Sequence, residues 1–133
     1  MPRTSVLFIR ASLLYLLAGF TLGGLLLADK ALLFWPGLFA WIPVHADLLL
    51  SGWLVQLSMG VTYWIVPRFS NRQSPRGNPL WITFSFWTFN AGLLLALYSP
   101  LLPDALLPAR GLQALGVLFF VISVWKRIKP TGA

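Results

Sequence analysis

The chain of 133 residues has no cysteine, no glutamate and a single histidine, His45. Without cysteine it can form no disulfide, hold no metal through a thiolate and use no cysteine nucleophile. Proton-coupled transport usually relies on an acidic side chain buried within a span. The only acid inside an expected span is Asp47, close to that span's outer end. A small proton-driven exporter is therefore disfavoured.

Charged residues are scarce as well. They make up 10% of the chain, whereas hydrophobic residues make up 58% and the mean hydropathy is +0.78. Several apolar runs approach the ~20 residues that a helix needs to cross the ~30 Å hydrocarbon core. This predicts an all-α polytopic membrane protein, one membrane domain with spans at about 5–28, 43–66, 80–98 and 109–125. Short connections between the helices favour an antiparallel four-helix bundle.

The basic residues predict how the spans are oriented. If the spans alternate, one side of the membrane receives the N-terminus, the polar loop at 68–79 and the C-terminus. That side holds eight of the ten basic residues, and the other holds Lys30, Arg110 and all three aspartates. Lys and Arg concentrate in cytoplasmic loops. We expect a bacterial inner (cytoplasmic) membrane with both termini cytoplasmic. The orientation of the spans in the lipid bilayer then accounts for most of the basic residues, and no nucleic-acid partner is expected.

One face of the second span differs from the rest of that helix. Six residues recur on it at spacings of three or four: His45, Leu49, Gly52, Gln56, Gly60 and Tyr63. Polar and small side chains in a lipid-embedded helix should face inward, toward other helices or a bound group. In the first span, Gly19 and Gly23 form a G-x-x-x-G pair that predicts close helix approach. Gln56 and Asn90 are expected to hydrogen-bond across helices.

His45 would lie near the outer end of the second span, where its position leaves two roles open. Ionisable residues within spans are candidates for function, but one at the interface can also be satisfied by water. A Ser-His-Asp triad with Asp47 is excluded, because two positions along a helix are about 200° apart. No catalytic residue is expected, and the isolated chain is not expected to be an enzyme.

Two strings carry a resemblance to a known family. The first is His-Ala-Asp-Leu-Leu-Leu-Ser-Gly-Trp at 45–53, and the second is Leu-Leu-Ala-Gly at 16–19 with Gly23-Gly24 after it. They resemble the first two helices of subunit I of haem-copper oxidases, and more closely the short four-span proteins described as oxidase subunit I-like. Recognisable motifs cover about the first 70 residues of this sequence. The remainder is similar in its number of spans.

The resemblance implies a haem-binding module for electron transfer or gas binding. In the oxidases the matching histidine is an axial ligand of the low-spin haem, so His45 would bind the iron of haem b, with Gly52 as a further cofactor-binding residue. Lys30 and Arg110 would face the propionates, although snorkelling toward the headgroups is an alternative for both. The later histidines of the full subunit have no counterpart here. This chain alone is therefore not an oxidase.

Several alternatives remain open from the sequence. Met59 is 14 residues beyond His45, which is about 21 Å along the helix and too far to share an iron. A second ligand would need a homodimer or a larger membrane complex; otherwise a five-coordinate iron could bind a gas. The chain could instead be an accessory subunit of a respiratory or photosynthetic complex without a cofactor. His45 could also ligate the magnesium of a chlorophyll.

Overall fold

The computed structural model describes residues 1–66 and 78–128. Within these residues, four helices are long and apolar enough to cross a membrane: Arg3–Leu32, Leu38–Ile65, Pro79–Leu97 and Pro103–Trp125. The described chain is all-helical, without any strand. The prediction of a helical, membrane-type chain is confirmed at this level. Most of the predicted polar loop lies outside the described residues.

Helix α1 (Arg3–Leu32) extends beyond the expected span 5–28 at both ends. Its 30 residues are about 45 Å long, more than the ~30 Å core requires. The helix ends where Leu33 turns left-handed, at φ 51°, and donates its N–H to the Asp29 carbonyl oxygen. Gly37, at φ 92°, continues the turn in a conformation that suits glycine. The first two spans are therefore joined by a tight turn at residues 33–37.

The second span is built from four consecutive helical segments. They are η1 (Leu38–Trp41), α2 (Ile42–Asp47), the π-helical η2 (Leu48–Val55) and α3 (Gln56–Ile65). Pro43 lies in the first turn of α2, where its missing N–H leaves no bond unmade. The hydrogen bonds of a π-helix reach one residue further than those of an α-helix. Residues after η2 are therefore rotated relative to the α-helical register that the sequence pattern assumes.

The remaining spans are α4 (Pro79–Leu97) and α5 (Leu106–Trp125), the latter preceded by the 3-10 turn η3 (Pro103–Ala105). Asn78 caps α4, because its side-chain oxygen accepts the Leu80 N–H at 2.9 Å. The bounds of α4 differ from the expected 80–98 by one residue at each end. The last span starts before the expected residue 109, since η3 leads directly into α5.

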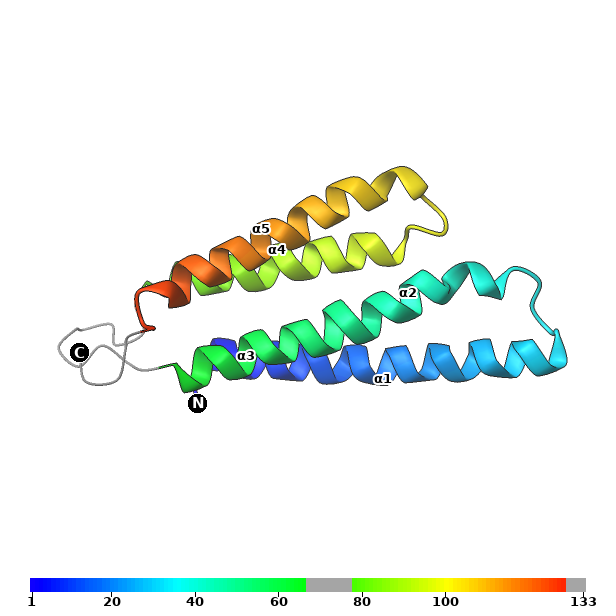
Figure 1. The fold of residues 1–133 in the computed structure, drawn as a ribbon, viewed down its shortest axis with the longest axis horizontal. Coiled ribbons are helices and arrows are strands. Elements are labelled where there is room, and N and C mark those ends of the chain that lie inside the picture. The colour runs from blue at the N-terminus through cyan, green and yellow to red at the C-terminus, as the bar shows by residue number, and fades with distance from the viewer. Residues whose placement is uncertain (67–77, 129–133) are drawn as a thin grey trace.

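The helices pair as two hairpins, α1 with α2–α3 and α4 with α5 (Figure 1). Glycines bring α1 and the second span into close contact. A Cβ atom on Gly19 would lie 2.6 Å from the Leu49 side chain, and one on Gly60 would lie 2.8 Å from that of Phe8. Both are closer than real Cβ contacts. The close approach predicted from the G-x-x-x-G pair is confirmed.

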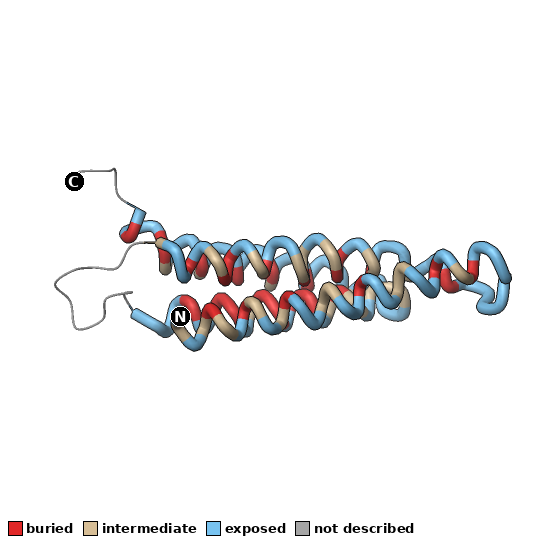
Figure 2. Tube along the Cα trace, turned by 90° about the horizontal axis from the view of Figure 1, so that it is seen from below, coloured by how far each residue is buried: buried red, intermediate tan, exposed pale blue. Residues whose placement is uncertain are grey.

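The buried residues lie along the lines where helices meet, and exposed residues cover the outside (Figure 2). On the predicted inward face, His45 and Leu49 are partly exposed and the other four residues are buried. All four spans contribute to one aromatic core near the chain ends. Its members are Phe8, Met59, Tyr63, Ile82, Phe86, Phe120 and Val124. The Phe8 and Phe86 rings meet edge to face, 5.1 Å apart.

The contact between α4 and α5 predicts the effect of two alanine substitutions. A Cβ on Gly116 would lie 2.7 Å from the backbone nitrogen of Phe89, which cannot move aside easily. We expect Gly116→Ala to lower the free energy of unfolding in detergent by about 1–3 kcal/mol. Gly111→Ala, on the same helix with nothing within 4 Å, should be neutral or slightly stabilising. Equal effects of the two changes would contradict this packing.

Candidate functional site

The His45 side chain lies against α1. Its Nδ1 is 2.8 Å from the Gly19 carbonyl oxygen. Because a carbonyl oxygen can only accept, Nδ1 is the nitrogen that carries the hydrogen. A Cβ atom on Gly23 would lie 2.5 Å from Cε1 and 3.3 Å from Nε2 of the ring. The G-x-x-x-G pair of α1 therefore makes the space that the imidazole occupies.

This arrangement leaves Nε2 with a lone pair. Within the described residues Nε2 has no hydrogen-bond partner, and the residue is partly exposed. Histidines that bind metals commonly donate the other ring nitrogen to a carbonyl or carboxylate, which sets the tautomer and the ring orientation. No three His, Cys, Asp or Glu residues gather around a metal position in the described part of the chain. Among the described residues, His45 therefore offers a single imidazole nitrogen without further ligating side chains around it.

Gly52 is the second predicted cofactor-binding residue. The space beside its Cα atom is filled by protein side chains. A Cβ there would lie 2.7 Å from Cγ of Tyr15 and 3.1 Å from Leu93. Tyr15 extends past it to donate its hydroxyl to Asn90 Oδ1 at 2.9 Å, linking α1 to α4. The predicted cross-helix role of Asn90 is confirmed. Gly52 makes room for Tyr15 in this structure.

Arg110 is paired with Asp47. The guanidinium NH2 is 2.8 Å from Asp47 Oδ2, and NH1 donates to Gln113 Oε1 at 2.9 Å. The Asp47 side chain is 12% exposed and that of Arg110 is 43% exposed, so the pair is only partly screened by solvent. It joins α5 to α2 and hence one hairpin to the other. Asp47 faces α5 while His45 faces α1, as their separation around the helix requires.

Lys30, the other predicted propionate partner, is exposed and forms no ion pair within the described part of the chain. Its neighbour Asp29 is 2% exposed. The structure therefore does not bring the four predicted site residues together. The His45 side chain contacts α1, Gly52 packs against Tyr15, and Arg110 forms an ion pair with Asp47. Lys30 is exposed.

Arg127 has a role that the sequence does not reveal. Its side chain is 2% exposed, and NH2 donates to the carbonyl oxygens of Tyr63 at 3.1 Å and Val66 at 2.6 Å. The guanidinium also lies 4.8 Å from the centre of the Tyr63 ring. A cation at the C-terminal carbonyls of a helix is favourable. In the sequence analysis Arg127 is only one of the basic residues on the cytoplasmic side. Its position directly after a long apolar run is a weak indication that its side chain is buried.

The prediction for Gln56 is wrong within the described residues. The side chain is fully buried, and neither its amide nitrogen nor its amide oxygen has a hydrogen-bond partner there. It stands directly after the π-helical segment, at the first residue of α3. An α-helical spacing argument places Gln56 on the inward face but cannot say what its amide meets.

Comparison of the chain with protein-family models, curated proteins and solved structures found no match.

The ion pair between the hairpins predicts a measurable coupling. Arg110→Gln and Asp47→Asn should each lower the free energy of unfolding in detergent. Combined in a double-mutant cycle, the two changes should show an interaction of about 1 kcal/mol. Lys126→Gln, a change to an exposed basic residue without a salt bridge in the described chain, is the control and should leave stability unchanged. Strictly additive effects would mean that the pair does not join the hairpins.

Proposed function

We propose that the chain is a haem-binding membrane module in which Nε2 of His45 is an axial ligand. The observation that carries the proposal is the hydrogen bond from Nδ1 to the Gly19 carbonyl oxygen, since it leaves the Nε2 lone pair for a metal. When bound, haem b supplies one-electron transfer or gas binding. The chain's own contribution is to orient the imidazole and fix its tautomer.

A six-coordinate iron would require a second chain. His45 is the single histidine of the sequence, and Met59 is buried in the aromatic core at 6% exposure. The chain therefore has no second histidine for the opposite side of the iron, and Met59 cannot reach it. We therefore propose a homodimer in which each copy gives one His45, or a larger membrane complex that supplies the other ligand. The partly exposed His45 lies on the hairpin of α1 and α2–α3, so a neighbour could reach it without separating the two hairpins.

Arg110 and Lys30 enter this proposal differently from the sequence prediction. Because Arg110 is engaged by Asp47, a propionate would have to compete with a carboxylate at 2.8 Å. Lys30 is exposed on α1, the helix whose Gly19 carbonyl oxygen accepts the hydrogen bond from His45. We therefore assign the propionate role to Lys30 and a structural role to Arg110.

A second candidate function is that of an accessory subunit without a cofactor. The observation in its favour is that the contacts of His45 with Gly19 and Gly23 also serve as ordinary helix packing. A chlorophyll held by His45 through magnesium is the third possibility, since it uses the same nitrogen. The absorption spectrum of the purified protein distinguishes the three.

We further propose that the four spans form one antiparallel bundle in a bacterial inner membrane, with both termini in the cytoplasm. The start of α1 and the end of α5 lie at the same end of the molecule in Figure 1, which supports this arrangement. The charge distribution supports the orientation.

The absence of cysteine makes this topology directly testable. Single substitutions Lys30→Cys and Lys126→Cys can be labelled in intact spheroplasts with a membrane-impermeant maleimide. We expect Lys30→Cys to react from outside and Lys126→Cys to react only after the membrane is opened. The reverse pattern would overturn the orientation, and labelling of both from outside would overturn the number of spans.

The haem proposal predicts the spectra of four variants. Purified wild type should show haem Soret and α bands on reduction, and His45→Ala should lose them. His45→Gln can still donate to the Gly19 carbonyl, so it should fold normally but lose the haem. Gly23→Ala should displace the imidazole and shift or abolish the bands, because its methyl would lie 2.5 Å from Cε1. Gly24→Ala, whose methyl would meet nothing within 4 Å, should match wild type.

A pyridine haemochrome assay on each variant gives the haem stoichiometry. One haem per two chains would indicate a shared haem, and one per chain a separate site. A colourless wild type after haem-sufficient expression would falsify the proposal and favour the accessory subunit. Haem that survives both His45 changes would mean that another group binds it.

A further inference from the structure

A nearly buried carboxylate lies at the C-terminal end of α1, apart from His45. Asp29 is 2% exposed, and its Oδ1 accepts the Trp35 N–H at 2.7 Å. No Lys, Arg or His forms a salt bridge with it within the described residues. Removing a carboxylate from water is costly unless it is paired with a cation or well hydrogen-bonded. Asp29 has one oxygen that is used and a second that is available.

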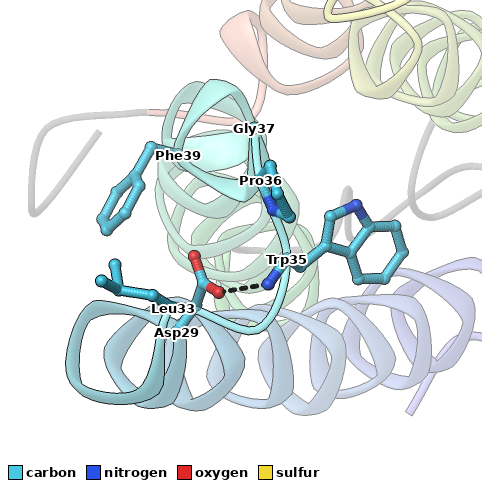
Figure 3. Close-up of a pocket in the computed structure, with 6 residues that line it drawn as sticks. All are labelled: Asp29, Leu33, Trp35, Pro36, Gly37 and Phe39. Atoms are coloured by element: carbon cyan, nitrogen blue, oxygen red, sulfur yellow. Dashed lines mark hydrogen bonds between the residues drawn. The ribbon is translucent and has the colours of Figure 1, made fainter.

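A pocket of about 230 Å³ opens beside this carboxylate. Its lining residues are Asp29, Leu33, Trp35, Pro36, Gly37 and Phe39. Figure 3 shows that one carboxylate oxygen faces the Trp35 N–H, while the other points between Phe39 and Pro36. The Trp35 indole points away from the pocket. The pocket therefore combines one negative charge with mainly apolar walls.

The position of the pocket indicates what could fill it. Asp29 is 26 residues beyond Arg3, or about 39 Å along a helix, and thus beyond one hydrocarbon core length. That places it at the level of the lipid headgroups if α1 spans the membrane. Lys30, adjacent in sequence, is exposed. A pocket with one carboxylate and mainly apolar walls, at headgroup depth, matches the ammonium of a lipid headgroup.

We propose that this pocket binds the primary ammonium of an ethanolamine phospholipid. The –NH3⁺ group donates to the second oxygen of Asp29 and lies against the Phe39 ring, a favourable surface for a cation. The volume is several times the ~30 Å³ of a water molecule, so a two-carbon amine fits. A bare divalent ion fits poorly, because calcium requires six to eight oxygen ligands.

The alternative is that Asp29 serves only the turn, by accepting the Trp35 N–H. Asp29→Asn separates the two roles, since asparagine retains an oxygen at Oδ1 for that bond and loses the charge. Asp104→Asn is the matched control, because Asp104 is an exposed acid in η3 and does not line the pocket. Neither change touches His45, so the result is independent of the haem proposal.

The experiment measures lipid retention by native mass spectrometry and thermal midpoints in detergent. Short-chain phosphatidylethanolamine is compared with phosphatidylglycerol, which has the same tails and phosphate but no ammonium. Wild type and Asp104→Asn should retain the ethanolamine lipid preferentially and melt at a higher temperature with it. In Asp29→Asn the affinity should fall about tenfold or more, as expected for loss of a charge-assisted hydrogen bond.

Equal retention of the two lipids by wild type would overturn the proposal, whatever the variants do. Unchanged preference in Asp29→Asn would also overturn it. If that variant does not fold, Phe39→Leu replaces it and should weaken ethanolamine-lipid retention while preserving apolar bulk. Phosphatidylcholine bound as tightly as phosphatidylethanolamine would exclude a primary ammonium as the recognised group. Free ethanolamine bound as tightly as the lipid would exclude a lipid as its source.

Discussion

The contact between α1 and the second span is the constraint on which the rest of the structure depends. Lipid tails do not drive apolar helices together, so helix association relies on van der Waals contact and hydrogen bonds. Glycines at 19, 23, 52 and 60 bring the two backbones close enough for both. The Ser5 hydroxyl then reaches the Gly60 carbonyl oxygen, and His45 reaches that of Gly19. The glycines thus build the hairpin and also orient its imidazole.

The second hairpin joins the first through polar contacts near both ends. Arg110 pairs with Asp47 near one end, and Arg127 donates to the last carbonyls of α3 at the other. Between them, Tyr15 and Asn90 link α1 to α4. In a low-dielectric interior such contacts are strong when satisfied and costly when broken. His45 takes no part in them, so a group bound to Nε2 would leave the contacts between the hairpins intact.

Much of the helical layout can be predicted from the sequence, because hydrophobic length and helix-ending residues act locally. Runs of about 20 apolar residues identify spans, and Pro43, Asn78 and Gly37 stand at helix starts or turns, where their geometry suits them. The π-helical segment at Leu48–Val55 escapes this reasoning. No residue type within it is specific to a π-helix, so a pattern in the sequence does not reveal it.

The sequence by itself determined that the chain is helical and of membrane type, and that His45 shares a face with small residues. The length of the apolar runs is sufficient for the first conclusion, and the spacing along one helix is sufficient for the second. Tertiary structure alone decided the partners: Gly19 for His45, Asp47 for Arg110, Tyr15 for Gly52, and a pocket beside Asp29. Each of these depends on the rotation and depth of one helix against another. The rotation and depth of a helix are set by the packing of many side chains from several helices. A residue pattern within one segment carries no information on that packing.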